Sequence, residues 1–336
     1  MKCKPFYKHC KKFLARFVLI SSLLLSPASA LETDQYMAWG KRLNDISAYL
    51  NSFLNQRTWQ TLADINQLPL QQRALLKCED IHKKIVTSYN KNKGLDFISE
   101  IERRIYDDAT LSRYPPISAS KLAVIKQSIY KKSQLFKLKM FGINININGI
   151  HLGVDKLDHV LRTGYLYFKT YQKYRDQGLS IQQAEIAAIQ KGIAQEKTYF
   201  GYWVSGVFSY ADLEANYQGL RLHQHFCTGE HPYLEQRANN TWYFSYPIDI
   251  KAYINPWFDE SYNNSAYSHL RFHSVYPELK KYCGLQNSTW LQQRNHYYQY
   301  WQDQESFSVH YLQQQTILGK LDDPKPYSLN TICTKK

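Results

Sequence analysis

The sequence contains little glycine and, after its first 30 residues, no long apolar run, and both absences limit what the chain can be. Glycine accounts for 14 of the 336 residues, and no phosphate-binding loop, dinucleotide fingerprint or nucleic-acid-binding motif occurs. No later stretch is apolar enough to predict a membrane span. No internal repeat or low-complexity tract is present. We therefore expect a chain that buries a substantial core and does not bind nucleic acid.

The first 30 residues have the features of a secretory signal peptide. Basic residues lie between Lys2 and Arg16, an apolar run covers 17–25, and Ala28-Ser29-Ala30 has the A-x-A pattern of a cleavage site. The alternative is an uncleaved anchor, but the apolar run is about half of the ~20 residues that a span requires. The pattern predicts an exported protein, periplasmic or secreted, with a mature chain that begins at Leu31.

Part of the positive charge belongs to this segment. Residues 1–30 contain six Lys or Arg and no Asp or Glu, so their removal lowers the formal net charge from +14 to +8. The remaining basic residues are spread along the chain, as at Lys131-Lys132. We expect them to form a solvated surface, and association with an anionic membrane surface is the alternative.

Four cysteines follow the predicted signal peptide: Cys78, Cys227, Cys283 and Cys333. An even number in an exported chain predicts two disulfides, and the separations are too wide for a zinc-binding C-x-x-C motif. Three pairings are open. We expect Cys227 to pair with Cys283, because both flank one aromatic-rich segment, and by elimination Cys78 to pair with Cys333.

The spacing of apolar residues predicts a mainly α-helical fold. From Tyr36 onward, apolar residues recur at spacings of three and four, as on one face of an amphipathic helix. These residues are Trp39, Leu43, Ile46, Leu50 and Phe53. Further helical patterns cover about 70–89, 95–108 and 118–139. Together they predict an N-terminal helical scaffold over residues 31–140.

The period changes at the start of the central segment, 141–226. Isoleucines alternate with asparagines from Ile143 to Asn148 before Gly149, which predicts a short β-hairpin. His151 lies in this hairpin, where we expect a surface or turn position. Two helices are predicted next, over 155–173 and about 180–199, the second with a capping box at its start.

The segment 227–336 is rich in aromatic and turn residues. Trp242-Tyr243-Phe244 and the residues after it predict short strands and ordered loops, and a terminal helical pattern covers about 291–318. Such aromatic density suits stacking on glycans or lipids, but packing in the core of the same domain is the expected role.

Five polar residues of the central segment are candidate catalytic residues. Asp155 and His159 lie four positions apart, as do Asp212 and Asn216, so on helices each pair shares one face. Glu196 lies near the end of the helix between them. A carboxylate can orient an imidazole that then binds a metal or moves a proton. The set predicts a hydrolase of an envelope component, with a divalent metal as candidate cofactor and His159, Glu196 and Asp212 as candidate ligands.

The alternative is a non-catalytic structural or binding protein in which the same residues form a structural network. Helices bury Asp–His and Asp–Asn pairs as bridges between them, and Asp212, three residues after Ser209, could simply stabilise a helix N-terminus. His223 lies seven residues after Asn216 on the same predicted face and is a further candidate metal ligand. Asp158 and Arg162, four apart, predict a surface salt bridge.

Other catalytic arrangements have weaker support. Ser205 and Ser209 lie near glycines without forming Gly-x-Ser-x-Gly. Asp259 and Glu260 are acids beside aromatic residues, as in glycosidases, but adjacent side chains diverge and do not form a facing pair.

The order Asp155-Lys156-x-x-His159, Glu196, Ser209-x-x-Asp212-x-x-x-Asn216-x-x-Gly219 resembles that of VanZ-like and related small bacterial envelope proteins. VanZ-like proteins span the membrane several times, whereas charged residues such as Lys169 and Arg175 interrupt the helices here. The region from Asp155 to Cys283 also resembles a family of exported bacterial proteins with Tyr-rich loops and a Trp257-x-Asp259-Glu260 patch. Both resemblances imply a bacterial envelope setting, and neither implies a particular reaction.

Overall fold

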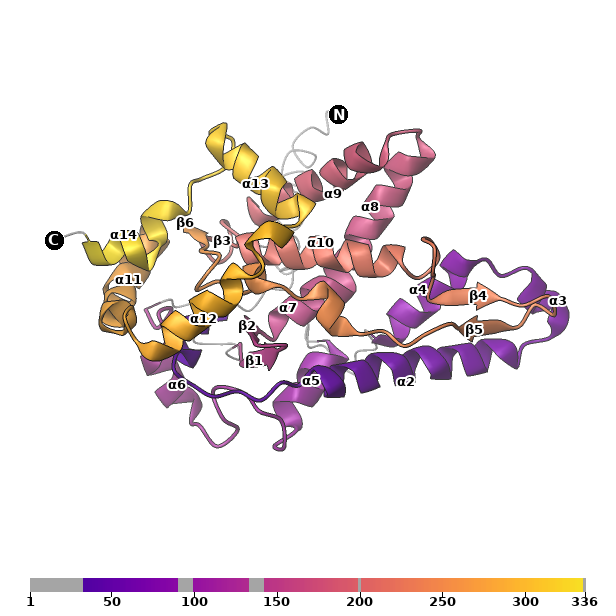
Figure 1. The fold of residues 1–336 in the computed structure, drawn as a ribbon, viewed down its shortest axis with the longest axis horizontal. Helices are drawn as coiled ribbons and strands as arrows, with labels where there is room; N and C mark the ends of the chain where they lie inside the picture. Colours follow the sequence, from indigo (N-terminus) through magenta and orange to yellow (C-terminus); the bar gives the residue numbers. More distant parts are fainter. Residues whose placement is uncertain (1–32, 90–98, 133–141, 199–200, 335–336) are drawn as a thin grey trace, which may run out of the picture.

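The computed structural model describes residues 33–89, 99–132, 142–198 and 201–334. The predicted signal peptide lies outside these residues. The described chain is mainly α-helical, with three two-stranded antiparallel sheets (Figure 1). The predicted fold class is therefore confirmed.

The helices and strands have the following bounds. The α-helices are α2 (Ser47–Asn66), α3 (Leu70–Ala74), α4 (Cys78–Tyr89), α5 (Glu100–Asp107), α6 (Lys121–Gln127), α7 (Asp155–Asp158), α8 (Gly164–Asp176), α9 (Ile181–Glu196), α10 (Tyr210–Gln224), α11 (His269–Leu279), α12 (Thr289–Gln299), α13 (Phe307–Ile317) and α14 (Leu329–Thr334). The strands are β1 (Asn144–Ile147), β2 (Ile150–Gly153), β3 (Val207–Phe208), β4 (Leu234–Gln236), β5 (Trp242–Phe244) and β6 (Ala266–Tyr267). The short helical turns include η1 (Gln35–Ala38), the π-helical η3 (His159–Thr163), η4 (Ile250–Tyr253), η5 (Pro256–Phe258), η6 (Lys280–Leu285) and η7 (Gln302–Gln304).

Helix α10 lies at the centre of the fold (Figure 1). Each of its residues from Tyr210 to Leu220 is buried, and α8, α9, α13, η3 and η5 all pack against it. A helix that is buried all round has no solvent face for its polar side chains. Those side chains must therefore find partners on the surrounding elements.

Two glycines set the distance between α10 and α8. A Cβ built on Gly164 would lie 2.5 Å from Cα of Gly219, and one built on Gly219 would lie 2.2 Å from the carbonyl oxygen of Val160. No side chain fits in this crossing. This close approach brings His159, at the start of η3, against α10.

The hairpin β1–β2 follows its prediction closely. Ile147 pairs with Ile150 across a turn in which Asn148 and Gly149 have φ angles of 53° and 77°. The expectation for His151 was wrong, because this residue lies within β2 and is only 9% exposed. One hydrophobic cluster contains the hairpin isoleucines together with residues of α2, β5 and η4, so the aromatic-rich segment packs on the helical scaffold.

Several predicted helices are shorter than their apolar patterns. The N-terminal helix begins only at Ser47: the turn η1 ends before Gly40, which has a φ of 72°, and the chain then extends to pair with Asn146 of β1 through the backbone N–H of Ile46. The apolar residues from Trp39 to Phe53 are nevertheless buried, as predicted. The pattern over 70–89 contains α3 and α4, and that over 118–139 contains only α6 among the described residues. The terminal pattern divides into α12 and α13, because Ser306 caps a new helix.

The predicted disulfide pairing was wrong, although all four cysteines are bonded. Cys78 pairs with Cys227 at a Cα–Cα distance of 5.8 Å, and Cys283 pairs with Cys333 at 5.5 Å. Helix α4 packs beside the end of α10, which places Cys78 next to Cys227. Helix α14 packs on η6, which places Cys333 next to Cys283. Cys227 and Cys283 flank one aromatic-rich segment in the sequence, but they are not paired with each other in the fold.

No helix in the described part of the chain is long and apolar enough to cross a membrane.

Candidate functional site: a buried lysine, histidine and carboxylate cluster

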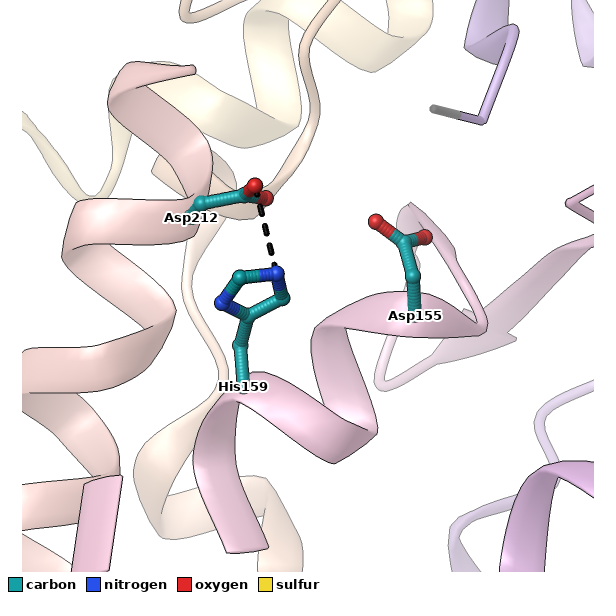
Figure 2. Close-up of side chains that lie close together, drawn as sticks. All are labelled: Asp155, His159 and Asp212. Carbon is teal, nitrogen blue, oxygen red and sulfur yellow. Dashed lines mark ion pairs between the residues drawn. The ribbon is translucent and has the colours of Figure 1, made fainter. Parts of the chain in front are cut away.

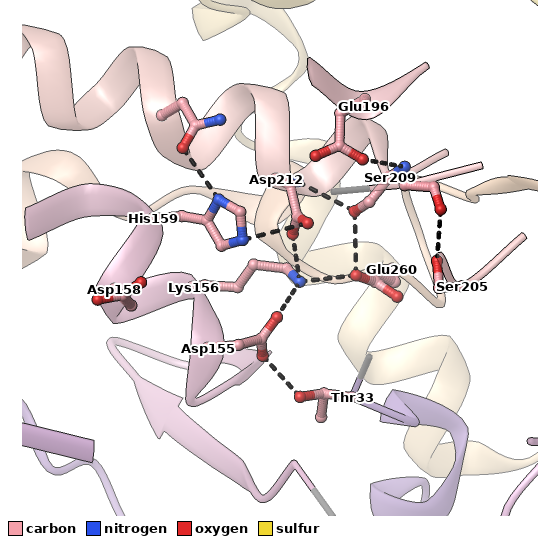
Figure 3. A network of polar contacts seen from close by, with 12 residues as sticks. Thr33, Asp155, Lys156, Asp158, His159, Glu196, Ser205, Ser209, Asp212 and Glu260 are labelled. Carbon is pink, nitrogen blue, oxygen red and sulfur yellow. Dashed lines mark hydrogen bonds and ion pairs between the residues drawn. The ribbon is translucent and has the colours of Figure 1, made fainter. Parts of the chain in front are cut away.

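The centre of the candidate site is the side chain of Lys156, which has no solvent exposure. Its ammonium Nζ lies 2.6 Å from a carboxylate oxygen of each of Asp155, Asp212 and Glu260. These acids come from α7, α10 and the loop after η5 (Figure 3). We call Asp155, Lys156, His159, Glu196, Asp212, Asn216 and Glu260 the Lys156 cluster.

His159 is held between two residues of α10. Its Nε2 lies 3.2 Å from Oδ2 of Asp212, and its Nδ1 lies 3.0 Å from Oδ1 of Asn216. Figure 2 shows His159 reaching from its own helix to Asp212 on the facing one. The four-residue spacing of Asp212 and Asn216 places both on the face of α10 that meets His159. The two predicted pairs therefore converge.

The turn that carries His159 is π-helical, although α7, η3 and α8 run without a break. A π-turn adds one residue to a helical turn and shifts the side chains that follow, and such turns recur at functional sites. In this chain the π-turn lies directly before Gly164, where α8 crosses α10 at Gly219.

Ser209 connects Glu196 to the rest of the cluster. The Oγ of Ser209 caps α10 by accepting from the amide N–H of Asp212, and it donates to Oε1 of Glu260 at 3.1 Å. Its backbone N–H donates to Oε2 of Glu196 at 3.4 Å. Ser209 is thus the N-cap, and Asp212 lies in the first turn of α10, where its charge stabilises the helix N-terminus as considered, while its carboxylate also faces Lys156 and His159. Thr33 donates to Oδ1 of Asp155 at 2.6 Å on the opposite side of the cluster (Figure 3).

The two cations are strongly stabilised by their neighbours. Burial alone would lower the pKa of His159, but the Asp212 carboxylate raises it to about 10. Burial likewise opposes the charge on Lys156, but Asp155, Asp212 and Glu260 raise its pKa well above the usual range. Burial opposes the charge on Asp212 too, but His159 and Lys156 hold its pKa well below the ordinary value. At neutral pH these three residues are ionised.

In two glutamates of the cluster, by contrast, burial raises the pKa and favours the neutral carboxyl group. Burial raises the pKa of Glu196 to about 8, with a further contribution from the charge of Asp212. Burial also raises the pKa of Glu260 to about 7, although Lys156 opposes the shift. These two carboxyl groups can therefore hold or release a proton near neutral pH, which an ordinary surface glutamate cannot do.

The same residues include a set that could hold a metal ion. One ligand atom from each of Asp155, His159 and Asp212 lies within 4.8 Å of the others. The ammonium of Lys156, however, lies among the carboxylates where a cation would sit, and the proton on His159 occupies the nitrogen that faces Asp212. A metal would have to displace both, so the donor set in this arrangement fits a proton-transfer site better than a metal site.

His223, a further candidate metal ligand, belongs to a different group of residues. Its Nδ1 lies 2.8 Å from Nε2 of His82, and its Nε2 lies 3.1 Å from the carbonyl oxygen of Leu161. Burial lowers the pKa of His223 to about 3, so the ring is neutral. It joins α4 to α10 and does not complete a ligand set with His159.

Lys156 and Glu260 were not among the candidate residues from the sequence. Lys156 stands inside the Asp155 to His159 motif, where a lysine normally indicates a solvated position. Glu260 was rejected as half of an acidic pair with Asp259, and the two do diverge, since Asp259 instead binds Arg294 and Tyr298. A buried lysine needs acidic partners, and this requirement is a physical signal that could have indicated Glu260.

Two other predicted features lie at the edge of the cluster. Asp158 and Arg162 form the predicted salt bridge, with the Asp158 side chain only 12% exposed. Ser205 donates to the carbonyl oxygen of Gly201 and stabilises the loop before β3. Neither makes a contact that would suit a nucleophile.

Comparisons of the chain with protein-family models, with curated proteins and with solved structures found no match.

Proposed function

We propose that the protein is an exported hydrolase of a bacterial envelope component, with the Lys156 cluster as its acid–base centre. The observation that carries this proposal is the position of His159, protonated and held between Asp212 and Asn216, beside carboxyl groups with pKa values of about 7 and 8. Groups that titrate near the working pH are the ones that transfer protons efficiently.

The energetic cost of the cluster supports a functional role. Replacing a buried ion network with apolar residues is often neutral or stabilising, so stability alone gives little reason to keep one. Strongly shifted pKa values gather at functional sites because catalysis requires them. Here His159, Glu196 and Glu260 are all shifted toward the range between 7 and 10.

The proposed chemistry is hydrolysis by general acid and base. Glu260 takes a proton from a water molecule as that water attacks the substrate. His159 gives its proton to the leaving group, and Asp212 stabilises its charged form before the transfer. The ammonium of Lys156 stabilises the negative charge that develops on the attacked group. Water is thereby added across the broken bond, and the resting state returns when Glu260 releases one proton to solvent and His159 takes one up from solvent.

The compartment is also part of the proposal. Two disulfides are typical of chains that fold in an oxidising compartment, and the first 30 residues have the pattern of a signal peptide. The motif order that resembles VanZ-like envelope proteins supports the same location. Its substrate would then be a component of the envelope.

A non-catalytic structural or binding role is the second candidate, and the burial of the cluster favours it. Lys156 is fully buried, and no other member is more than 8% exposed. A network of this kind can fix the relative positions of α7, α9 and α10 without meeting a substrate.

Hydrolysis assays on the oxidised mature chain separate the two candidates. The probes are purified peptidoglycan and phospholipid vesicles, and released fragments are identified by mass spectrometry. We expect the wild type and Lys251→Met, a control at an exposed ion pair, to release products, and His159→Ala and Asp212→Asn to lose at least a hundredfold in rate while remaining folded. A folded wild type that releases nothing from either probe, or an equally active His159→Ala, contradicts the proposal.

Metal analysis of the same samples tests the role of a metal. We expect the active wild type to contain less than stoichiometric metal. Stoichiometric metal that is lost on His159→Ala would instead assign Asp155, His159 and Asp212 as ligands.

A further inference from the structure

A pocket of about 460 Å³ lies between the β1–β2 turn and helix α12. The residues around it include Asn148, His151, Trp290, Gln293, Arg294 and Tyr297, and none of them belongs to the Lys156 cluster. Its volume falls within the ~300–1,000 Å³ usual for small-molecule sites. Two connections link it to the cluster. His151 precedes Asp155 by four residues in the chain, and the side chain of Arg294 donates to that of Asp259, the neighbour of Glu260.

Aromatic rings form much of the lining and are held in place by their neighbours. Trp290 is half-buried, with its ring centroid 5.4 Å from that of His151 and 6.3 Å from that of Trp39. Tyr297 donates from its hydroxyl to the carbonyl oxygen of Asn148 at 2.9 Å. Rings fixed in this way can bind a ligand face without losing much side-chain entropy.

The lining of the pocket includes one carboxylate and no unpaired cation. Arg294 donates to Asp259, Ser261 and Asn295, and an exposed carboxylate, Asp45, also lies at the pocket. Burial lowers the pKa of His151, so its ring is neutral. An anionic ligand would find no unpaired cation among these groups.

His151 and Gln293 remain as hydrogen-bonding groups for a ligand. The Nδ1 atom of His151 is buried without a hydrogen-bond partner, while the ring lines the pocket. Gln293 also lines the pocket and is exposed on α12, one helical turn before Tyr297. An amide and a neutral imidazole can each donate and accept, as a ligand with several hydroxyl groups requires.

We propose that this pocket binds an uncharged saccharide, with one face of a sugar ring stacked on Trp290 and its hydroxyl groups bonded to Gln293 and His151. Sugars combine an apolar C–H face with a rim of hydroxyls, which matches an aromatic wall beside neutral polar side chains. The site stands independently of the proposed hydrolase activity, because binding requires no member of the Lys156 cluster.

Calorimetric titration of the oxidised mature chain tests the site. The probes are maltotriose and the trimer of N-acetylglucosamine, with inorganic phosphate as a charged comparison. We expect saturable binding of at least one trisaccharide and none of phosphate. Trp290→Ala and Gln293→Ala should each weaken the binding at least tenfold, and Trp203→Ala, at a 76% exposed ring outside the pocket, should leave it unchanged.

Because Trp290 also packs on Trp39, its replacement is checked by the unfolding midpoint, and Gln293→Ala supplies the variant that leaves packing intact. Absence of binding to both trisaccharides, binding that Gln293→Ala leaves unchanged, or tighter binding of phosphate would overturn the proposal. His159→Ala serves to separate the two proposals. We expect it to retain saccharide binding even if hydrolysis is lost.

Discussion

The ammonium of Lys156 lies 2.6 Å from the carboxylate of Glu260, a residue 104 positions later in the chain. The first residue belongs to α7 and the second to the loop after η5, so the contact joins the central helices to the aromatic-rich segment. Asp212 contacts the same ammonium from α10. One buried cation thus connects three parts of the fold.

Replacing this cation tests how much the fold depends on it. In Lys156→Met the three carboxylates lose their shared counter-charge while remaining buried. We expect the free energy of unfolding to fall by about 3–5 kcal/mol, the usual effect of breaking a buried ion pair. Urea denaturation measures the change, with Lys251→Met as the exposed control. Equal stability of Lys156→Met and the wild type would show that the three carboxylates do not depend on the ammonium.

The protonation of the histidines is directly measurable. NMR of histidine side chains should show His159 charged and His223 neutral throughout pH 5 to 9, because their pKa values are about 10 and about 3. In Asp212→Asn, burial is no longer opposed by the carboxylate, so the pKa of His159 should fall below 6.5. A neutral His159 at pH 7 in the wild type would contradict the assigned role as a proton donor.

Glu196 should make stability depend on pH. Its carboxyl stays protonated in the folded chain up to a pKa of about 8, whereas in the unfolded chain it ionises near 4.5. The folded state therefore binds more protons between these values, and this contribution to stability is present below pH 4.5 and is lost as the pH rises to 8, by at most about 1.4 kcal/mol per pH unit. Unfolding midpoints from pH 4.5 to 8 should show a smaller decrease for Glu196→Gln than for the wild type. Identical profiles would mean that the group is ionised in the folded chain.

The crossing of α8 and α10 should tolerate no added methyl group at Gly219. The Cβ in Gly219→Ala would lie 2.2 Å from the backbone oxygen of Val160, so the two elements must separate. We expect a loss of about 1–3 kcal/mol in unfolding free energy and a lower pKa for His159, because its contacts to α10 lengthen. Gly284→Ala is the matched control, since no atom lies within 4 Å of the added Cβ. Comparable stability of the two variants would refute the close contact.

The disulfide pairing can be established by peptide mapping. Digestion without reduction should give one linked pair containing Cys78 and Cys227 and another containing Cys283 and Cys333. Replacing both members of either pair by serine should cost about 2–5 kcal/mol. A linked peptide with Cys227 and Cys283 would restore the pairing expected from the sequence.

Local patterns in the sequence were sufficient for the helical class, the hairpin and the core of the site. Four-residue spacing put Asp155 with His159 and Asp212 with Asn216, because this relationship acts over one helical turn. The break at Gly40 and the start of a new helix at Ser306 were missed, because an apolar period says which residues are buried and does not fix where a helix begins.

Only the tertiary structure decided which distant residues meet. The ion partners of Lys156, the pairing of the four cysteines and the placement of His223 with His82 depend on how whole helices pack, and no sequence spacing records that packing. The physical reason is that side-chain periodicity determines the face a residue occupies. Which element covers that face depends on the best packing of all the apolar surfaces together, and this packing brought a buried lysine to three carboxylates.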